Sequence, residues 1–400
     1  MFKKTLAAVA VLGAFAGAAT AANVTLYGVI DEGLNYNYTK IGDQDKDVYG
    51  LNSGLNSGNR WGLKGTEELG NGYTVGFQLE SGFNSDDGKL GQGGRLFGRA
   101  ATAYVTGPFG TLAAGRDGAL DSGLGTVSYI YSYLPFGTGW GGVMKNSYFN
   151  FGYADRADNT LTYITPDLGG LKLYAQYSFQ ADGQEAASAN DNNRYAALGA
   201  QYKAGAFSTG IVVDYLMKAE TTHWVTSETA AVKANDDLKD QLKVSYGASY
   251  DFGVAKVMGM AQYSKHASKI GGTWDTPRVY DKDNAAGHVK DGSAAALVGD
   301  FEGWNLGLGV TAPLAGGTAY AQVSYVDVEN NGDFTNVLGT SELADGTKYQ
   351  GYGAGLGYTY PLSKRTLVYT YGGWHQLKVK DEDTTKVKVG EVGLGLVHKF

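Results

Sequence analysis

Charged side chains at alternating positions are the first features of this sequence whose types and spacing could do chemistry. In "RWGLKG", Arg60 and Lys64 share one parity, and Trp61 and Leu63 share the other. Successive side chains of a β-strand point to opposite faces, so the pattern predicts a strand with one basic face and one apolar face. Basic groups held on one face can attract ions and orient dipolar solutes.

Motifs for enzymatic or metal chemistry are missing or incomplete. The histidines are scattered and no pair has metal-ligand spacing: His223, His266, His288, His375 and His398. No G-x-S-x-G nucleophile motif occurs. In "GYGAGLG", at 351–357, Leu356 stands where a dinucleotide-binding motif needs its last glycine. Glycine at alternate positions suits instead a strand that packs closely or faces a narrow lumen. We therefore expect no metal and no cofactor.

Period-two alternation identifies the elements that must position the charged residues. Runs at 171–180, 242–252 and 318–325 alternate mainly apolar with polar residues. The longer runs have about ten residues, the length of a tilted strand that crosses a bilayer. After the third run the parity inverts at Val326 and Val328. We interpret this inversion as a bulge or as the end of the strand.

Tight turns and longer polar stretches alternate along the chain, and their number predicts the number of strands. Seven turns are expected at 69–72, 107–110, 166–170, 203–206, 251–253, 313–317 and 361–365. Eight longer stretches are expected at 39–57, 83–94, 118–157, 181–192, 217–239, 266–293, 329–346 and 376–385. Together they connect sixteen strands. Short turns at one end and long loops at the other are typical of an antiparallel transmembrane β-barrel, whereas a soluble sandwich or propeller should lack this asymmetry.

The N-terminal residues predict export. Lys3 and Lys4 precede an apolar stretch at 6–17, and Ala19-Thr20-Ala21 forms a small-x-small cleavage site. We expect residues 1–21 to be a signal peptide and residues 22–400 to form one barrel domain. The formal charge of the whole chain is −7, and cleavage of the signal peptide would remove Lys3 and Lys4 and make the mature chain more negative. A nucleic-acid partner is therefore disfavoured.

The chain ends in "GLGLVHKF", with strand-like alternation up to Phe400. Because a barrel has no edges, the last strand must pair with the first, which we expect at 23–31. We predict that this pairing closes the barrel and that Phe400 anchors its end.

Five longer segments resemble the trimeric general-diffusion porins of Gram-negative bacteria, in the beta-proteobacterial and neisserial branch. They are "RWGLKGTEELGNGYTVGFQLESGF" (60–83), "LFGRAATAYVTGPFGTLAAGR" (96–116), "RADNTLTYITPDLGG" (156–170), "YPLSKRT" (360–366) and "GLVHKF" (395–400). The resemblance implies an outer-membrane homotrimer of sixteen-stranded barrels that passes ions and small hydrophilic solutes. It also implies that the third loop, here 118–157, folds into the barrel and narrows it.

Charged residues are expected on both sides of that constriction. A cation on the lipid face costs about 2 to 4 kcal/mol at the bilayer midplane, so Arg60, Lys64 and Arg99 should face the lumen. The family's basic wall matches Arg60 and Arg99 best, with Lys64, Arg116 and Arg156 as further candidates. The expected opposing carboxylates are Asp117, Asp121, Asp155 and Asp158. Whether anions or cations are preferred stays open, with a lean toward anions.

The third loop is unusually aromatic for this resemblance. Its rings are Tyr129, Tyr131, Tyr133, Phe136, Trp140, Tyr148, Phe149, Phe151 and Tyr153. They could pack the loop against the inner wall, which is the preferred interpretation, or offer stacking faces to passing sugars.

Other readings and partners remain open. "DQDKD" at 43–47 starts like a calcium loop, but Val48 and Gly54 replace the glycine and glutamate that the motif needs. We interpret it as a solvated acidic loop, which leaves open weak divalent bridging to the phosphates of outer-membrane lipids and lipopolysaccharide. The alternative function is an outer-membrane barrel enzyme of the lipase or protease type, and a plugged adhesive barrel is a third possibility.

Overall fold

The computed structural model describes residues 23–41, 44–141, 151, 155–186, 188–219, 239–270, 298–332, 334–335, 342–343, 346–380 and 386–400. The expected signal peptide lies outside these residues. The strands are β1 (Asn23–Ile41), β2 (Gln44–Ser53), β3 (Arg60–Gly70), β4 (Tyr73–Gly82), β5 (Ala100–Gly107), β6 (Gly110–Gly118), β7 (Arg156–Ile164), β8 (Leu171–Ser178), β9 (Arg194–Ala204), β10 (Phe207–Met217), β11 (Gln241–Asp251), β12 (Lys256–Lys269), β13 (Val298–Leu314), β14 (Gly317–Asn330), β15 (Phe334–Thr335), β16 (Glu342–Leu343), β17 (Lys348–Pro361), β18 (Thr366–Val379) and β19 (Lys386–Lys399).

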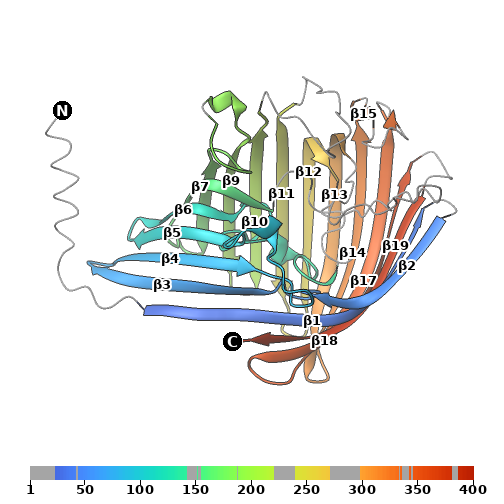
Figure 1. Ribbon diagram of the computed structural model, residues 1–400, viewed down its shortest axis with the longest axis horizontal. Helices are drawn as coiled ribbons and strands as arrows, with labels where there is room; N and C mark the ends of the chain where they lie inside the picture. The colour runs from blue at the N-terminus through green and yellow to red at the C-terminus, as the bar shows by residue number, and fades with distance from the viewer. Residues whose placement is uncertain are drawn as a thin grey trace.

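All of these strands except β15 and β16 form one closed antiparallel barrel with short turns at one end and long connections at the other (Figure 1). Three short 3-10 helices, η1 (Gln92–Gly94), η2 (Ile130–Tyr133) and η3 (Ala189–Asp191), lie in the connections. No helix in the described part of the chain is long and apolar enough to cross a membrane. β15 and β16 pair only with each other.

The barrel has sixteen strand positions around its circumference, as predicted. The sheet contains seventeen strands, but β2 and β3 lie end to end beside β1 and together occupy one position. β2 pairs with the upper part of β1, from Glu32 to Ile41, and β3 pairs with the lower part, from Asn23 to Val29. The expectation of a loop at 39–57 was wrong in detail, since β1 continues to Ile41 and most of the stretch is β2. The backbone donors and acceptors of these residues are satisfied by extending the β1–β2 ladder.

Alternation along the strands separates a polar inner face from an apolar outer face. In β11, Lys243, Ser245 and Ser249 are buried inside the barrel, while Tyr246 and Tyr250 on the other parity are exposed on the outside. In a bilayer the outer face contacts lipid, where apolar side chains are stable and charges are costly.

The parity inversion at Val326 is neither a bulge nor a strand end, so that expectation was wrong. β14 continues to Asn330 with unbroken register against β13. Val326 and Val328 point inward into a buried cluster with Phe301 and Tyr349. Between these two valines, Asp327 points to the outer face and forms an ion pair with Lys380. The inversion therefore marks the level where the outer wall changes from apolar to charged.

The C-terminal strand closes the barrel against the first strand, as predicted, but most of the paired stretch lies further along β1 than expected. β19 pairs with Val29–Ile41 of β1 and Phe400 bonds to Gly28, so four residues of the expected 23–31 segment take part. At the last residue, the Gly28 amide donates to the Phe400 carbonyl and the Phe400 amide donates to the Gly28 carbonyl, both at 3.1 Å. Gly28 leaves room for the Phe400 ring, since a Cβ there would lie 2.2 Å from it.

Deletion of Phe400 should weaken barrel closure. It removes both hydrogen bonds to Gly28, and each such bond contributes about 0.5 to 1.5 kcal/mol. We expect the free energy of unfolding in urea to fall by about 1 to 3 kcal/mol, with a lower refolding yield in detergent. Phe400→Leu keeps both backbone bonds and is the control. An unfolding curve for the deletion that overlays the wild type would remove this role from Phe400.

Candidate functional site

Five arginines come together on one part of the inner wall. Arg60 begins β3, Arg116 lies near the end of β6, Arg156 begins β7, and Arg95 and Arg99 lie in the connection before β5. Backbone contacts fix two of them, because Arg156 Nε donates to the Arg99 carbonyl and Arg116 Nε to the Gly98 carbonyl, both at 2.9 Å. We call these five residues the arginine cluster.

Two carboxylates lie within the arginine cluster. Glu80 Oε1 of β4 is 2.6 Å from Arg99 Nε. Asp158 of β7 accepts from Arg116 Nη1 at 2.6 Å and from Arg95 Nη1 at 2.7 Å. Three of the five guanidinium groups, those of Arg95, Arg99 and Arg116, thus share two carboxylates in these ion pairs. The local charge is strongly positive, which favours anions in the adjacent water.

The two predicted basic residues of β3 sit at different heights on the wall. Arg60 donates from Nη2 to Ser57 Oγ at 2.6 Å, and its Nε has no hydrogen-bond partner among the described residues. Lys64 lies further along β3, closer to the short turn that follows Gly70, and its side chain is exposed. Its Nζ lies 5.3 Å from the centre of the Tyr27 ring. The Tyr27 hydroxyl donates to Glu80 at 2.9 Å, which links Lys64 to the cluster.

The other three predicted carboxylates take no part in these three ion pairs, although Asp117 and Asp155 attract Arg156 electrostatically. Asp117 accepts bonds from the Gly118 amide and from the amide and hydroxyl of Thr126, so it shapes the start of its own loop. The Asp155 carbonyl accepts from the Ala119 amide at 3.3 Å. The Asp121 side chain forms an ion pair with Lys243 of β11.

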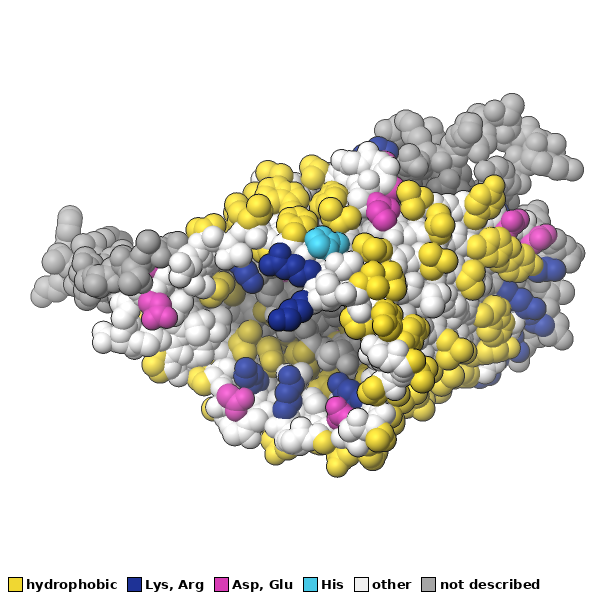
Figure 2. All heavy atoms as spheres, turned by 90° about the horizontal axis from the view of Figure 1, so that it is seen from below, with side chains coloured by type: hydrophobic (Ala, Val, Ile, Leu, Met, Phe, Trp, Pro, Cys, Tyr) yellow, Lys and Arg dark blue, Asp and Glu magenta, His cyan; other side chains and the backbone are white. Residues whose placement is uncertain are grey.

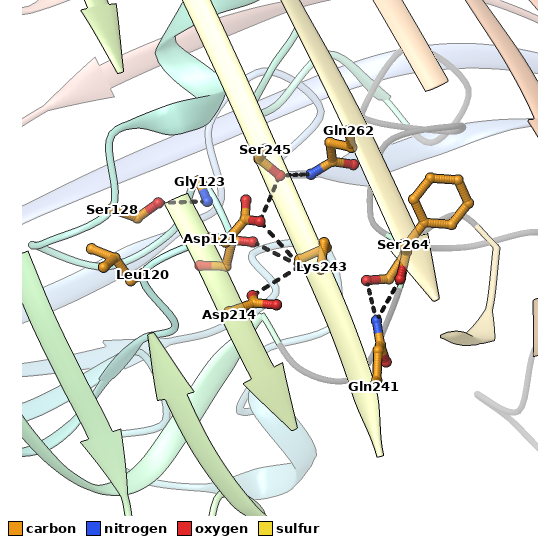
Figure 3. Close-up of polar contacts among 12 residues, drawn as sticks. Leu120, Asp121, Gly123, Ser128, Asp214, Gln241, Lys243, Ser245, Gln262 and Ser264 are labelled. Carbon is orange, nitrogen blue, oxygen red and sulfur yellow. Dashed lines mark hydrogen bonds and ion pairs between the residues drawn. The ribbon is translucent and has the colours of Figure 1, made fainter. Parts of the chain in front are cut away.

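Asp121 belongs to a buried group of three charges, which we call the β11 triad (Figure 3). Lys243 Nζ of β11 is 3.6 Å from Asp121 Oδ2 and 3.4 Å from Asp214 Oδ2 of β10. All three side chains are almost fully buried. Lys243 Nζ also donates to the Asp121 carbonyl at 3.2 Å. The triad therefore ties the segment after β6 to the inner wall.

Neutral partners complete the triad. Ser245 Oγ donates to Asp121 at 2.6 Å, and the Tyr195 hydroxyl donates to Asp214 at 3.2 Å. Burial raises the pKa of Asp121, and the nearby Lys243 only partly opposes that shift. Two carboxylates share one ammonium here, so full ionisation would leave one excess buried negative charge. Charges taken out of water are stable only when they are well paired.

Aromatic residues of the same segment pack against the wall. Tyr129 donates to the carbonyls of Ala200 and Ile211 at 3.0 and 2.8 Å. Tyr131, Tyr133, Phe136 and Trp140 are at most 4% exposed, so packing covers their ring faces. Tyr148, Phe149 and Tyr153 lie outside the described residues. The described rings support the packing interpretation and leave little surface for sugars to stack on.

Glycines on the inner wall admit these rings. A Cβ at Gly247 would lie 2.4 Å from the Tyr133 ring, and one at Gly357 would lie 3.0 Å from both Phe136 and Trp140. Gly357 belongs to the period-two glycine run of β17, which therefore fits the close-packing explanation.

Sequence reasoning missed Glu80, Arg95, Asp214 and Lys243. Glu80 shares its strand parity with Gln78, and Lys243 shares its parity with Ser245 and Ser249, so alternation could have placed both on the inner face. No local signal could have paired Lys243 with Asp121, which lies 122 residues away. Arg95 lies in an irregular connection, where the alternation of residues along a strand cannot predict which way its side chain points.

Seen from below, the molecule is hollowed, and lysine and arginine side chains surround the hollow (Figure 2). Hydrophobic side chains cover much of the outer wall beside it. This arrangement suits a water-filled passage with basic walls inside a lipid-facing cylinder.

Comparisons with known proteins agree with this geometry. A family model described as "Gram-negative porin" matches residues 7–390. An outer membrane porin protein of Bordetella pertussis is 33% identical over the full length of both chains. Outer membrane porin protein 32 of Delftia acidovorans is 30% identical over 99% of this chain and 95% of its own. The solved structure of an anion-selective porin from Comamonas acidovorans superimposes with a TM-score of 0.64 at 25% identity, covering 95% of this chain and all of that one.

Proposed function

Because the chain belongs to the Gram-negative porin family, we propose that its channel prefers anions and that the arginine cluster sets this preference. The protein resides in the outer membrane and forms a passive diffusion channel. The observation that carries the proposal is the gathering of five guanidinium groups, of which three share two carboxylates in ion pairs. Fixed charges of one sign on a lumen wall raise the local concentration of the opposite ion.

The segment between β6 and β7 supports the same preference. Of its carboxylates, Asp117 bonds to its own loop and Asp121 is paired with Lys243. Asp121 is therefore not available to offset the arginine cluster, whereas Asp117 and Asp155 each attract Arg156 electrostatically. We infer that the segment narrows the passage and that its carboxylates offset the five guanidinium groups only in part. The related anion-selective porin from Comamonas acidovorans is consistent with this reading.

Three finer features belong to the same proposal. We infer that residues 1–21 are removed on export and that 22–400 form the mature barrel. We also infer a homotrimer that exchanges ions and small hydrophilic solutes across the membrane. We assign the protein no enzymatic activity, because porins are channels; hydrolysis of an ester or peptide by the purified protein would contradict this assignment.

Planar-bilayer recording of the refolded protein tests the proposal. In a KCl gradient we expect ohmic steps in groups of three and a reversal potential with the sign of chloride selectivity. A potential with the sign of potassium selectivity would overturn the anion preference while leaving the channel intact. Insertion without conductance would overturn the open channel itself.

A further inference from the structure

Four lysines line the inside of the barrel at its short-turn end. They are Lys172 near the start of β8, Lys203 near the end of β9, Lys256 at the start of β12 and Lys399 at the end of β19. We call these residues the mouth lysines. Their strands lie at separate places around the barrel, and none of the four belongs to the arginine cluster.

Strand parity places the mouth lysines on the inner face. Each is an even number of residues away from a buried side chain of the inner wall on its own strand. In the same order, these buried residues are Gln176, Gln201, Met260 and Val397. Residues of the other parity, such as Leu173, Tyr202 and Val257, are exposed apolar side chains of the outer wall. Basic side chains surround the hollow that Figure 2 shows from below.

The inner face at this mouth has a positive net charge. Lys64 lies deeper on the same face, which also has two carboxylates, Glu68 of β3 and Asp251 directly opposite Lys256. Among the described residues of this face, lysines thus exceed carboxylates by three. Charges of the adjoining turns cancel, with Lys364 and Arg365 against Asp167 and the terminal carboxylate of Phe400.

The opposite end of the barrel has the opposite charge. The eight longer polar stretches of the sequence, which join the strands at that end, contain 25 Asp and Glu against 14 Lys and Arg. Short turns of such barrels face the periplasm and long loops face the cell exterior. The passage therefore has a basic periplasmic mouth and an acidic exterior end.

Fixed charge at one mouth acts mainly on the ions that enter there. Anions that enter from the basic mouth come from a layer in which their concentration is raised, whereas anions from the other end do not. One positive charge about 10 Å away raises the concentration of a monovalent anion about 1.3-fold in 0.1 M salt, so three raise it about twofold. At 1 M salt the Debye length is only about 3 Å, and the effect disappears.

We propose that the mouth lysines make the channel rectify: under an applied voltage it passes small anions more readily from the periplasmic mouth outward than in the opposite direction. The lysines act by concentrating anions at the entrance, at a distance from the arginine cluster. This inference rests on the proposed anion preference, because anions must carry most of the current for the lysines to control it.

Single-channel currents of the refolded protein in symmetric KCl test the proposal. The chain has no cysteine, so biotin attached to Leu168→Cys marks the exposed turn at 166–170 in every protein. Streptavidin added to one chamber after the recording lowers the current only when that turn faces the chamber. In 0.1 M KCl we expect about twice the current when chloride enters from the marked side, and equal currents in 1 M KCl.

Two variants move the current ratio in opposite directions. Lys172→Gln with Lys203→Gln and Lys256→Gln leaves no net charge on this face and should lower the ratio in 0.1 M KCl to about one. Asp251→Asn with Glu68→Gln should raise it to about fourfold, which a loss of structure cannot explain. Symmetric wild-type current, the reverse direction, or an unchanged ratio in the triple variant would overturn the proposal.

The matched control is Lys265→Gln with Lys348→Gln and Lys378→Gln, which removes the same charge from the outer wall at the long-loop end. We expect its current ratio to stay within about 20% of the wild type. An equal loss in the control would show that the total charge, and not the mouth, sets rectification.

The reversal potential of the same channels in a KCl gradient separates this inference from the proposed function. A potassium-selective sign would overturn the anion preference. A chloride-selective sign with symmetric currents would overturn only the role of the mouth lysines.

Discussion

Replacing Arg99 with alanine shifts the reversal potential of the channel toward cations. The change removes one guanidinium from the arginine cluster and releases Glu80, whose Oε1 lies 2.6 Å from Arg99 Nε. A unit charge about 4 Å from an ion in water is worth about 1 kcal/mol. We therefore expect the chloride-to-potassium permeability ratio to fall about fivefold at low salt, with a smaller change at 1 M, where the Debye length is only about 3 Å.

The double variant Arg99→Ala with Glu80→Ala is the matched control for this prediction. It removes one positive and one negative charge, so the excess charge of the cluster is unchanged. We expect its permeability ratio to lie close to the wild type. If the double variant shifts as far as Arg99→Ala, shape and not charge sets the preference. If the permeability ratio of Arg99→Ala equals that of the wild type, the permeating ions do not pass close to the arginine cluster.

The fold could be predicted from the sequence because its determinants are local. Alternation, turns and loop lengths indicated sixteen strands, and lipid exposure alone forced Arg60 and Arg99 toward the lumen. The errors have a common physical cause. At 39–57 and after Val326, strands continue beyond the apolar part of the wall, where the outer face no longer has to be apolar. There the alternation weakens or inverts although the ladder of hydrogen bonds continues.

The candidate site was less predictable because it depends on contacts across the barrel. Parity shows which side of a strand Asp158 occupies, but only the closed structure pairs it with Arg95 and Arg116. The same holds for Asp121, which the resemblance suggested as a lumen charge opposite the arginines. In the structure it is buried against Lys243 instead.

Replacing Lys243 with methionine should detach the segment after β6 from the wall. Methionine fills similar volume but leaves Asp121 and Asp214 buried without their cation. Removing one partner of a buried ion pair costs about 3 to 5 kcal/mol. We expect that loss in urea unfolding of the protein in detergent, together with more current fluctuations, because the freed segment can move in the lumen.

Two further variants separate charge from packing in this prediction. Asp121→Asn leaves Lys243 paired with Asp214 in a neutral pair, so its unfolding free energy should fall by less than that of Lys243→Met. The triple variant Lys243→Met, Asp121→Asn and Asp214→Asn contains no charge at the site and should recover most of the stability, because a buried ion pair adds little beyond well-packed neutral residues. A Lys243→Met protein within about 1 kcal/mol of the wild type would show that the tyrosines and not the β11 triad hold the segment.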